Sequence, residues 1–267
     1  MVDPFLVKDK FMLFTLDIGN TNMNCGLWLG DELKADWRLS TRRESTLDEL
    51  GLAIGGVLNA AGFDFRSISG FIIASVVPPM RPALERFGAK YVKQRPIFLE
   101  AHRQTLLSLR YLNPIEMGAD RVAVSIAAYR RVRTRVIVVD LGTATTFDCI
   151  SEDGEHLGGA IAPGLRLSAE ALFQKTCRLP RLELFDLPDR IITQDTISNL
   201  NVGLIYGYVS LVDGLVTRIK KELGPAKVLA TGGLATLIAS ESTQIEEVLP
   251  DLTLEGLKIV YNEMAWR

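Results

Sequence analysis

Histidine and cysteine are scarce in this sequence, and several common functional motifs are absent from it. Two histidines and three cysteines stand far apart without a Cys-x-x-Cys pair, which argues against a zinc site or a disulfide framework. No Gly-x-x-x-x-Gly-Lys-Ser/Thr motif occurs, so a P-loop nucleotide site is excluded. No apolar run approaches the ~20 residues that span a bilayer, and we expect no contact with a membrane.

The sequence also lacks an excess of either positive or negative charge. Lys and Arg number 30 against 32 Asp and Glu, so the net charge of -2 gives no support for a nucleic-acid partner. We interpret all three cysteines as reduced and structural, which fits a cytoplasmic protein. The N-terminal residues lack a signal-peptide core, and residues 1–11 are either an extension or a start-site choice. The composition, 48% hydrophobic and 23% charged, is that of a soluble globular protein.

One hairpin carries the strongest chemical pattern. The apolar, β-branched residues 136–139 predict a buried strand that leads into Asp140, and Gly142 and Thr143 follow before a second strand over residues 147–150. Backbone N–H groups and hydroxyls at such a turn can donate to phosphate oxygens, and the carboxylate can hold a cation. The alternative is a hairpin whose Asp and Gly serve the turn alone.

The same pattern occurs earlier in the chain. Residues 11–16 predict a strand ending in Asp17, with Gly19 at the same offset. Two further strands and a helix follow each copy, over 23–29, 33–39 and 46–61 in the first and over 147–150, 156–161 and 165–176 in the second. This repeat predicts a duplicated α/β fold that binds phosphate between two lobes.

Two other stretches stand out. Residues 109–121 are polar, with Gly118 able to approach a ligand and with Asp120 and Arg121 opening an apolar helix. The simpler interpretation of this pair is a helix N-terminal charge and a surface ion pair. The long helix predicted over residues 197–223 contains Gly203, Gly207 and Gly214. Each glycine in a helix interior lowers helix stability by about 1 kcal/mol, so some compensation is expected. We predict that another helix or a second subunit approaches the backbone closely at these glycines.

Taken together, these segments resemble the type III pantothenate kinases, of the superfamily that includes acetate and sugar kinases, Hsp70 and actin. The resemblance runs from Leu13 to about Asn262. The motifs that carry it are D-I-G-N-T-N from Asp17, G-A-D-R from Gly118, D-L-G-T-A-T-T-F-D from Asp140, G-G-A-I-A-P-G from Gly158 and A-T-G-G from Ala230. It implies two RNase H-like (actin-like ATPase) lobes of duplicated mixed sheet with flanking helices, which we place at residues 1–133 and 134–267.

The resemblance also implies the activity. It predicts transfer of the γ-phosphate of ATP to pantothenate, giving 4'-phosphopantothenate, the first step of coenzyme A biosynthesis. The cofactors implied are Mg2+ with ATP and a monovalent cation, K+ or NH4+. A homodimer with the substrate site at its interface is the implied assembly.

Roles follow by resemblance, residue by residue. The implied catalytic base is Asp120. The implied ATP contacts are Asp17, Ile18, Gly19, Asn20, Thr21, Asn22, Met23, Asn24 and Thr143. The implied pantothenate contacts are Tyr111, Gly118, Ala119, Asp120, Arg121 and, from across the dimer, Thr196. Asp140 would hold the monovalent cation, and Asp17 would lie near Mg2+, directly or through water.

Two rival functions remain open. The first is a non-enzymatic regulator, because the family includes a Bvg accessory factor branch described as affecting transcription. A chain that had lost catalysis should have lost Asp17, Asp120 or Asp140, and all three are present. The second is another kinase or ATPase of the superfamily, whose members are usually longer and carry insertions. The short chain and the G-A-D-R segment favour pantothenate.

Overall fold

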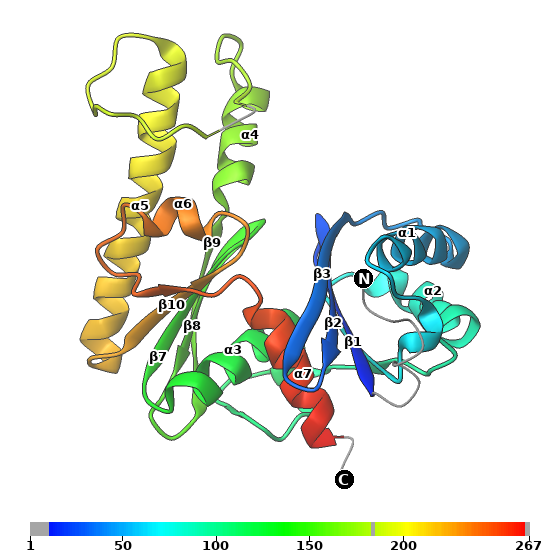
Figure 1. Cartoon of the computed structure of the whole chain (residues 1–267). Helices are drawn as coiled ribbons and strands as arrows, with labels where there is room; N and C mark the ends of the chain where they lie inside the picture. The colour runs from blue at the N-terminus through cyan, green and yellow to red at the C-terminus, as the bar shows by residue number, and fades with distance from the viewer. Residues whose placement is uncertain (1–10, 183–184, 265–267) are drawn as a thin grey trace. The chain divides into compact units, whose positions relative to one another are not determined.

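The chain folds into two compact units, each built on one mixed β-sheet with helices beside it (Figure 1). The computed structural model describes residues 11–182 and 185–264. The first unit takes the residues up to Leu106, Asn113–Ala127 and the residues from Thr253 on, and the second takes Leu107–Leu112 and Ala128–Leu252. One helix, α3 (Ala119–Val132), contributes to both units. The division of the chain into lobes at residues 1–133 and 134–267 stays a prediction from the sequence.

The first sheet has five strands in the order β3-β2-β1-β4-β5. The strands are β1 (Met12–Ile18), β2 (Asn22–Leu29), β3 (Glu32–Ser40), β4 (Gly70–Ser75) and β5 (Ile97–Phe98). β1 pairs antiparallel with β2 and parallel with β4, so the hairpin and the crossover meet at the same central strand. This is the mixed sheet that the alternation of predicted strands and helices indicated.

Helices cover both faces of this sheet. α1 (Leu47–Ala60) and α2 (Arg81–Phe87) pack their apolar residues against β1 and β4 in one core. α7 (Leu252–Met264) lies on the opposite side (Figure 1). Its Leu254 and Tyr261 lie so close to Gly26 and Gly70 that a Cβ on either glycine would crowd them. The predicted capping box of α1 is confirmed: the N–H of Glu49 donates to Oγ1 of Thr46, and the N–H of Thr46 donates to Oε2 of Glu49.

The second sheet has six strands in the order β11-β10-β7-β8-β9-β6. The strands are β6 (Ser108–Leu109), β7 (Val136–Leu141), β8 (Ala144–Ile150), β9 (Glu155–Pro163), β10 (Lys227–Thr231) and β11 (Glu247–Val248). The helices that follow its strands are α4 (Leu165–Lys175), α5 (Thr196–Leu223) and α6 (Ala235–Ala239). Shorter helical turns lie at residues 65–67, 78–80, 88–92, 101–103 and 114–116.

The predicted duplication is confirmed by the strand order. β9-β8-β7-β10-β11 of the second sheet repeats β3-β2-β1-β4-β5 of the first, with the same parallel and antiparallel pairings. The pairing of β2 with β3 and that of β8 with β9 also carry a bulge at the matching point. It lies beside Leu27 and Trp28 in the first sheet and beside Cys149 and Ile150 in the second. Because bulges are specific features of a sheet, their repetition supports a common origin of the two units.

α5 differs from expectation in one respect. By length and mean hydropathy it could cross a membrane, although 39% of its most apolar window is buried in the protein. The sequence prediction missed this because polar residues interrupt its apolar runs. The C-terminal part of the helix packs against the second sheet through Tyr208, Val212 and Val216. A core helix of a soluble protein meets the same criterion, so this is weak evidence of membrane insertion.

The cysteines are all free, as expected. Cys25 and Cys149 are buried in β2 and β8, where their small side chains pack. Cys177 is exposed beyond the end of α4, so the expectation that it serves the core is wrong. Cys177 lies in the segment between α4 and α5, outside any helix or strand. No local pattern in the sequence therefore indicated that it would be exposed.

Candidate functional site

The first predicted loop lies at the end of β1. Asp17 is buried, and its Oδ2 accepts a hydrogen bond from Nδ2 of Asn24, directly across the hairpin, at 3.1 Å. The N–H of Gly19 donates to the carbonyl of Asn22 at 2.9 Å and closes the turn. The strand therefore fixes the carboxylate, and the turn presents its backbone next to it.

Two residues beyond β3 hold this turn from outside. Thr41 Oγ1 donates to the carbonyl of Gly19 at 2.7 Å, and Arg43 Nη2 donates to Oδ1 of Asn20 at 3.1 Å. Neither Thr41 nor Arg43 is among the predicted site residues. Their role depends on the pairing of β2 with β3, which brings the end of β3 to the turn. Arg43 also places a positive charge where an anion would approach the loop.

Cys25 lies next to this carboxylate and is inert. Burial, and then the charge of Asp17, raise the pKa of the Cys25 thiol to about 12. The thiol therefore stays protonated at neutral pH and behaves as a small apolar side chain. Of these two neighbouring side chains, only Asp17 can therefore offer a charge to a ligand.

The second predicted segment opens α3. Asp120 stands in the first turn of the helix, and its Oδ1 accepts the N–H of Arg121 at 2.8 Å. A Cβ on Gly118 would overlap this carboxylate, so only glycine leaves room for it. The Arg121 side chain is buried, with 8% of the residue exposed. A buried guanidinium is stable only where hydrogen bonds or an anion compensate its desolvation.

The fold brings these two segments of the first unit together through Val76. The N–H of Val76 donates to the carbonyl of Ile18 at 3.0 Å. Its Cγ1 lies 3.3 Å from the position that a Cβ on Gly118 would take. The end of β4 therefore separates the Asp17 turn from the Gly118–Arg121 segment by one side chain.

The second unit presents the matching loop at the end of β7. The carbonyl of Ala144 accepts the N–H of Gly142 at 3.1 Å, and the carbonyl of Thr143 accepts the N–H of Gly164 at 3.1 Å. Gly232, with φ +94°, follows β10 and faces Asp140. A Cβ there would lie 2.6 Å from Oδ1 of Asp140 and 2.7 Å from the carbonyl oxygen of Leu141. Gly232 thus packs directly against these two oxygens, and a residue with a side chain would crowd both of them.

α5 is hydrogen-bonded to the same loop. Thr145 Oγ1 shares a buried hydrogen bond with the hydroxyl of Tyr208, which also donates to the carbonyl of Pro163 at 2.8 Å. Burial raises the pKa of Tyr208, so it remains a neutral phenol. The sequence analysis did not single out Tyr208, because an aromatic residue in an apolar helix gives no sign of its partner.

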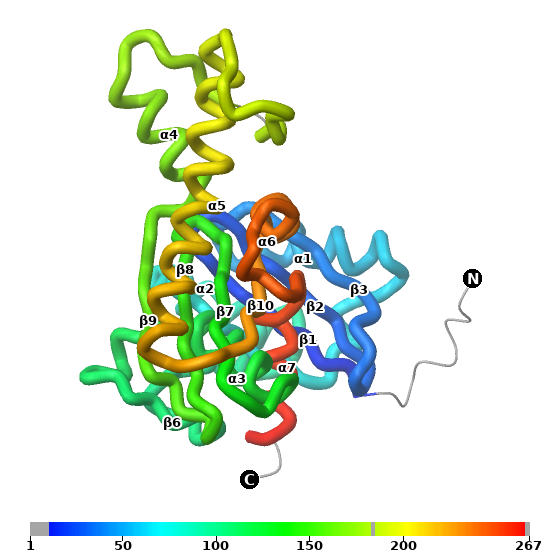
Figure 2. The backbone as a smooth tube through the Cα atoms, turned by 90° about the vertical axis from the view of Figure 1, so that its left-hand side faces the viewer, coloured from blue at the N-terminus to red at the C-terminus, as the bar shows by residue number. Residues whose placement is uncertain are grey.

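The remaining predicted contacts lie in the second unit. Tyr111 follows β6, and its ring centre lies 6.1 Å from that of His156. Thr196 is the first residue of α5, is exposed, and follows a helix cap in which Asp195 Oδ1 accepts the N–H of Ser198. The end of α5 at which Thr196 lies extends with α4 beyond the second sheet (Figures 1 and 2).

Metal binding can be tested on the donor set. Among the described residues no three His, Cys, Asp or Glu side chains gather as a metal cluster. Mg2+ in phosphoryl-transfer sites is held by one or two carboxylates together with the substrate phosphates, so a single carboxylate such as Asp17 fits that ion. The two oxygens beside Gly232 suit a monovalent cation, which binds carboxylate and carbonyl oxygens.

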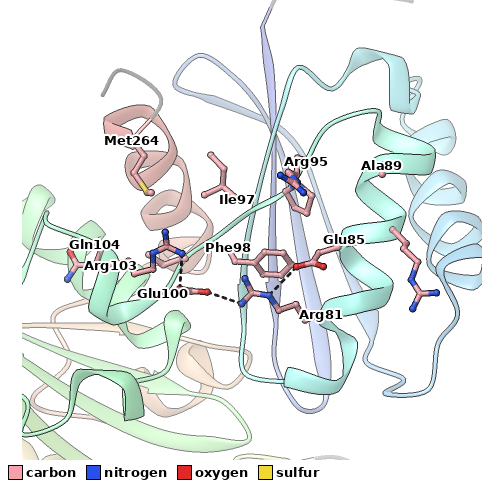
Figure 3. Close-up of a pocket in the computed structure, with 13 residues that line it drawn as sticks. Arg81, Glu85, Ala89, Arg95, Ile97, Phe98, Glu100, Arg103, Gln104 and Met264 are labelled. Atoms are coloured by element: carbon pink, nitrogen blue, oxygen red, sulfur yellow. Dashed lines mark hydrogen bonds and ion pairs between the residues drawn. The ribbon is translucent and has the colours of Figure 1, made fainter.

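A cavity of about 680 Å³ lies elsewhere in the first unit, between α2, β5 and the end of α7 (Figure 3). Arg81 bridges Glu100 at 2.8 Å and Glu85 at 3.3 Å and stacks on the ring of Phe98. The lining holds four arginines against Glu85 and Glu100, so the cavity keeps an excess of positive charge. The cavity shares no residue with the predicted loops and is not the site that the sequence indicated.

The chain is similar to known proteins over nearly its whole length. The family model of the type III pantothenate kinases matches residues 13–218. A type III pantothenate kinase of Geotalea daltonii is 48% identical over 251 residues, covering 94% of this chain and 98% of that protein. One from Myxococcus xanthus is 45% identical with the same coverage.

Among solved structures, a Baf family transcriptional activator from Campylobacter jejuni aligns with a TM-score of 0.59 and 23% identity, over 95% of this chain and all of that one. At this identity the likeness shows the fold alone.

Proposed function

The chain belongs to the type III pantothenate kinase family, and we propose that it phosphorylates pantothenate through Asp17, Asp120 and Asp140. It is an ATP-dependent phosphotransferase of coenzyme A biosynthesis. The observation that supports this function most is the match to family members over 94% of the chain. The local geometry of the three carboxylates supports the roles that follow.

The turn from Asp17 to Asn24 is proposed to bind the ATP phosphates. Phosphate oxygens need N–H and hydroxyl donors in a concave backbone, which a glycine-containing turn can provide. Asn24 fixes the carboxylate of Asp17 at 3.1 Å, and Thr41 fixes the turn, so little ordering is left for the ligand to cause. We place Thr143 of the second loop at the same nucleotide.

Asp17 would hold Mg2+, directly or through water, and Asp140 with the carbonyl of Leu141 would hold K+ or NH4+. When bound, these ions compensate the charge that develops on the transferring phosphoryl group. The protein's own contribution is to hold two carboxylates rigidly at the ends of buried strands. Phosphoryl transfer depends mainly on such alignment and charge compensation.

Asp120 is the proposed base. Its carboxylate would accept a hydrogen bond from the primary hydroxyl of pantothenate and orient that oxygen in line with the γ-phosphate. A carboxylate of ordinary pKa, about 4, is too weak to deprotonate an alcohol in advance, but it can take the proton as the O–P bond forms. Arg121, with its buried guanidinium, suits the carboxylate of pantothenate in a bidentate pair. Gly118, Ala119 and Tyr111 would complete the pocket.

A homodimer is proposed on two features of the second unit. The α4–α5 region and β9 expose many large apolar side chains, which in soluble proteins mark a contact with another protein. They are Ile161, Leu167, Leu172, Phe173, Leu187, Ile191, Ile192 and Ile197. The glycines of α5 add to this, because a Cβ on Gly203, Gly207 or Gly214 would meet nothing within 4 Å in the chain itself.

We therefore propose that a second subunit makes the expected close approach to these glycines. Thr196 lies in the same region of α5 and could reach pantothenate bound to the partner. We further propose a cytoplasmic location without membrane or nucleic-acid partners, which fits the family's role as a biosynthetic enzyme. In a dimer the apolar face of α5 would be covered by protein.

The test is pantothenate-dependent formation of ADP by the purified chain, with phosphopantothenate detected by mass spectrometry. Asp120→Asn should keep the fold and ATP binding but lose about 10²-fold or more of kcat. Asp153→Asn, an exposed turn carboxylate of the second unit, is the matched control and should keep full activity.

Near wild-type turnover in Asp120→Asn would remove the general-base role. Bound ATP without any pantothenate turnover in the wild type would point to another acceptor alcohol or to a regulator. Product formation that is independent of K+ would keep the kinase and remove Asp140 as the cation ligand.

A further inference from the structure

A buried Asp–His hydrogen bond in the second unit takes no part in the loops described above. Asp148 of β8 and His156 of β9 both have no exposed surface, and Nε2 of His156 lies 2.8 Å from Oδ1 of Asp148. The N–H of Gly158 donates to Nδ1 of the same ring at 3.2 Å, so the ring proton is on Nε2 and is donated to Asp148. Thr146 Oγ1 donates to the other carboxylate oxygen at 3.1 Å.

The duplicated fold shows that this pair is not needed to form the sheet. Strand register places Gly26 of the first sheet where Asp148 stands, and Leu33 where His156 stands. The first unit thus makes the same hairpin and the same bulge with apolar residues. Burying a carboxylate and an imidazole costs desolvation that apolar residues of similar volume would not incur, so the pair calls for another explanation.

His156 is also the point at which an extra strand is attached. β6 has no counterpart among the described residues of the first sheet, and it pairs with β9 at Leu109 opposite His156. The carbonyl of His156 accepts the N–H of Arg110 at 2.9 Å. The next residue, Tyr111, lays its ring against the imidazole at 6.1 Å between centres, tilted by 54°.

We propose that His156, held in one tautomer and one orientation by Asp148 and Gly158, is a positioning residue that sets Tyr111 for the pantothenate pocket. The main chain of His156 anchors the strand, and its ring fixes the tilt of the aromatic side chain. This rests on the proposed function, in which Tyr111 contacts pantothenate. A buried ring with both nitrogens hydrogen-bonded cannot rotate freely, whereas the leucine that replaces it in the first unit could adopt other rotamers.

A double-mutant cycle tests the proposal. His156→Gln keeps a donor for Asp148 but loses the ring face and the acceptor for Gly158, and Tyr111→Ala removes the side chain on which His156 acts. We expect His156→Gln to raise the KM for pantothenate about three- to tenfold in the wild type, with the KM for ATP unchanged. In the Tyr111→Ala background the same substitution should leave the pantothenate KM as it is.

A merely structural role predicts a different pattern. His156→Gln would then lower Tm without a selective effect on pantothenate KM, or would act equally in both backgrounds, and either result overturns the proposal. The matched control is His102→Gln, which removes the other histidine of the chain, an exposed one, and should change neither KM.

If His156→Gln does not fold, the proposal can be tested by nitrogen NMR, which measures the chemical shifts of the histidine rings in the folded wild type. The chain has two histidines, so His102→Gln assigns both signals. Pantothenate should shift the His156 signal in the wild type and not in Tyr111→Ala at saturation, and an equal shift in both refutes action through Tyr111. A wild type that does not turn over pantothenate would instead refute the proposed function.

Discussion

Replacing Gly232 with alanine should displace the carboxylate of Asp140, which we propose as a ligand of a monovalent cation. The new Cβ would lie 2.6 Å from Oδ1 of Asp140 and 2.7 Å from the carbonyl oxygen of Leu141. Real Cβ contacts stay above 3.0 Å, so the gap between the Cβ and the carboxylate would have to widen by about 0.4 Å and that to the Leu141 carbonyl by about 0.3 Å. The substitution therefore displaces both proposed cation ligands while leaving their chemistry intact.

The expected effect has two parts. Forcing a residue with a side chain to φ +94° costs about 1–3 kcal/mol of folding free energy. A misplacement of about 1 Å at a phosphoryl-transfer site can cost about 10²-fold, so a shift of this size predicts a loss of about tenfold. We expect that loss as a higher K+ concentration for half-maximal activity, together with a lower Tm.

Gly62→Ala separates the two parts. Gly62 has φ +83°, close to that of Gly232, but a Cβ there would meet nothing within 4 Å. It should lower Tm by a similar backbone cost and leave the K+ dependence unchanged. Activity measured against K+ for both variants decides the matter. A K+ response in Gly232→Ala identical to that of Gly62→Ala would refute the reasoning about Asp140.

Three further predictions concern a helix cap, the cysteines and a surface ion pair. Thr46→Ala should lower the free energy of unfolding by about 1 kcal/mol in urea, because α1 loses its capping box. A thiol reagent should label exposed Cys177 in the native protein and leave Cys25 unreacted, because burial is the main cause that raises the pKa of Cys25 to about 12; labelling of both at one rate would contradict this. Arg81→Gln should raise the pKa of Glu100, because the hydrogen bond from Arg81 is the main cause that holds it below the usual 4.5. A depressed carboxyl pKa stabilises the fold above the unfolded pKa, and this advantage is lost as pH falls through the folded pKa of Glu100. The wild type's advantage in urea should disappear in that acidic range, and a constant difference would refute the pairing.

Much of the fold could be read from local pattern. The helix α1 was predictable from its cap at Thr46 and its apolar spacing, and the structure places it at Leu47–Ala60. The long strands were equally clear, because alternation and turn residues bound them. β6 and β11 could not be predicted, because two residues in a strand conformation carry no period of their own and are held only by pairing with β9 and β10.

The candidate site divides in the same way. Asp17, Asp120 and Asp140 stand where a strand ends or a helix begins, and these are positions that sequence marks with glycine and capping residues. Thr41 and His156 are different, because their partners are fixed by strand register across a hairpin. A single sequence does not show which residues of neighbouring strands face one another, so neither residue could be identified in advance.

The two halves of the duplication locate function by their differences. The paired residues Ile18 and Met23 leave four residues in the first turn, 19–22, whereas Leu141 and Thr145 leave three in the second, 142–144. The longer turn offers one more backbone N–H to a phosphate, which fits its proposed role as the main nucleotide loop. The second half instead gains β6 and the Asp148–His156 pair, which fits a role in shaping the acceptor pocket. If the halves have divided nucleotide and acceptor binding in this way, substitutions in the 19–22 turn should raise the KM for ATP selectively, and substitutions around β6 should raise that for pantothenate.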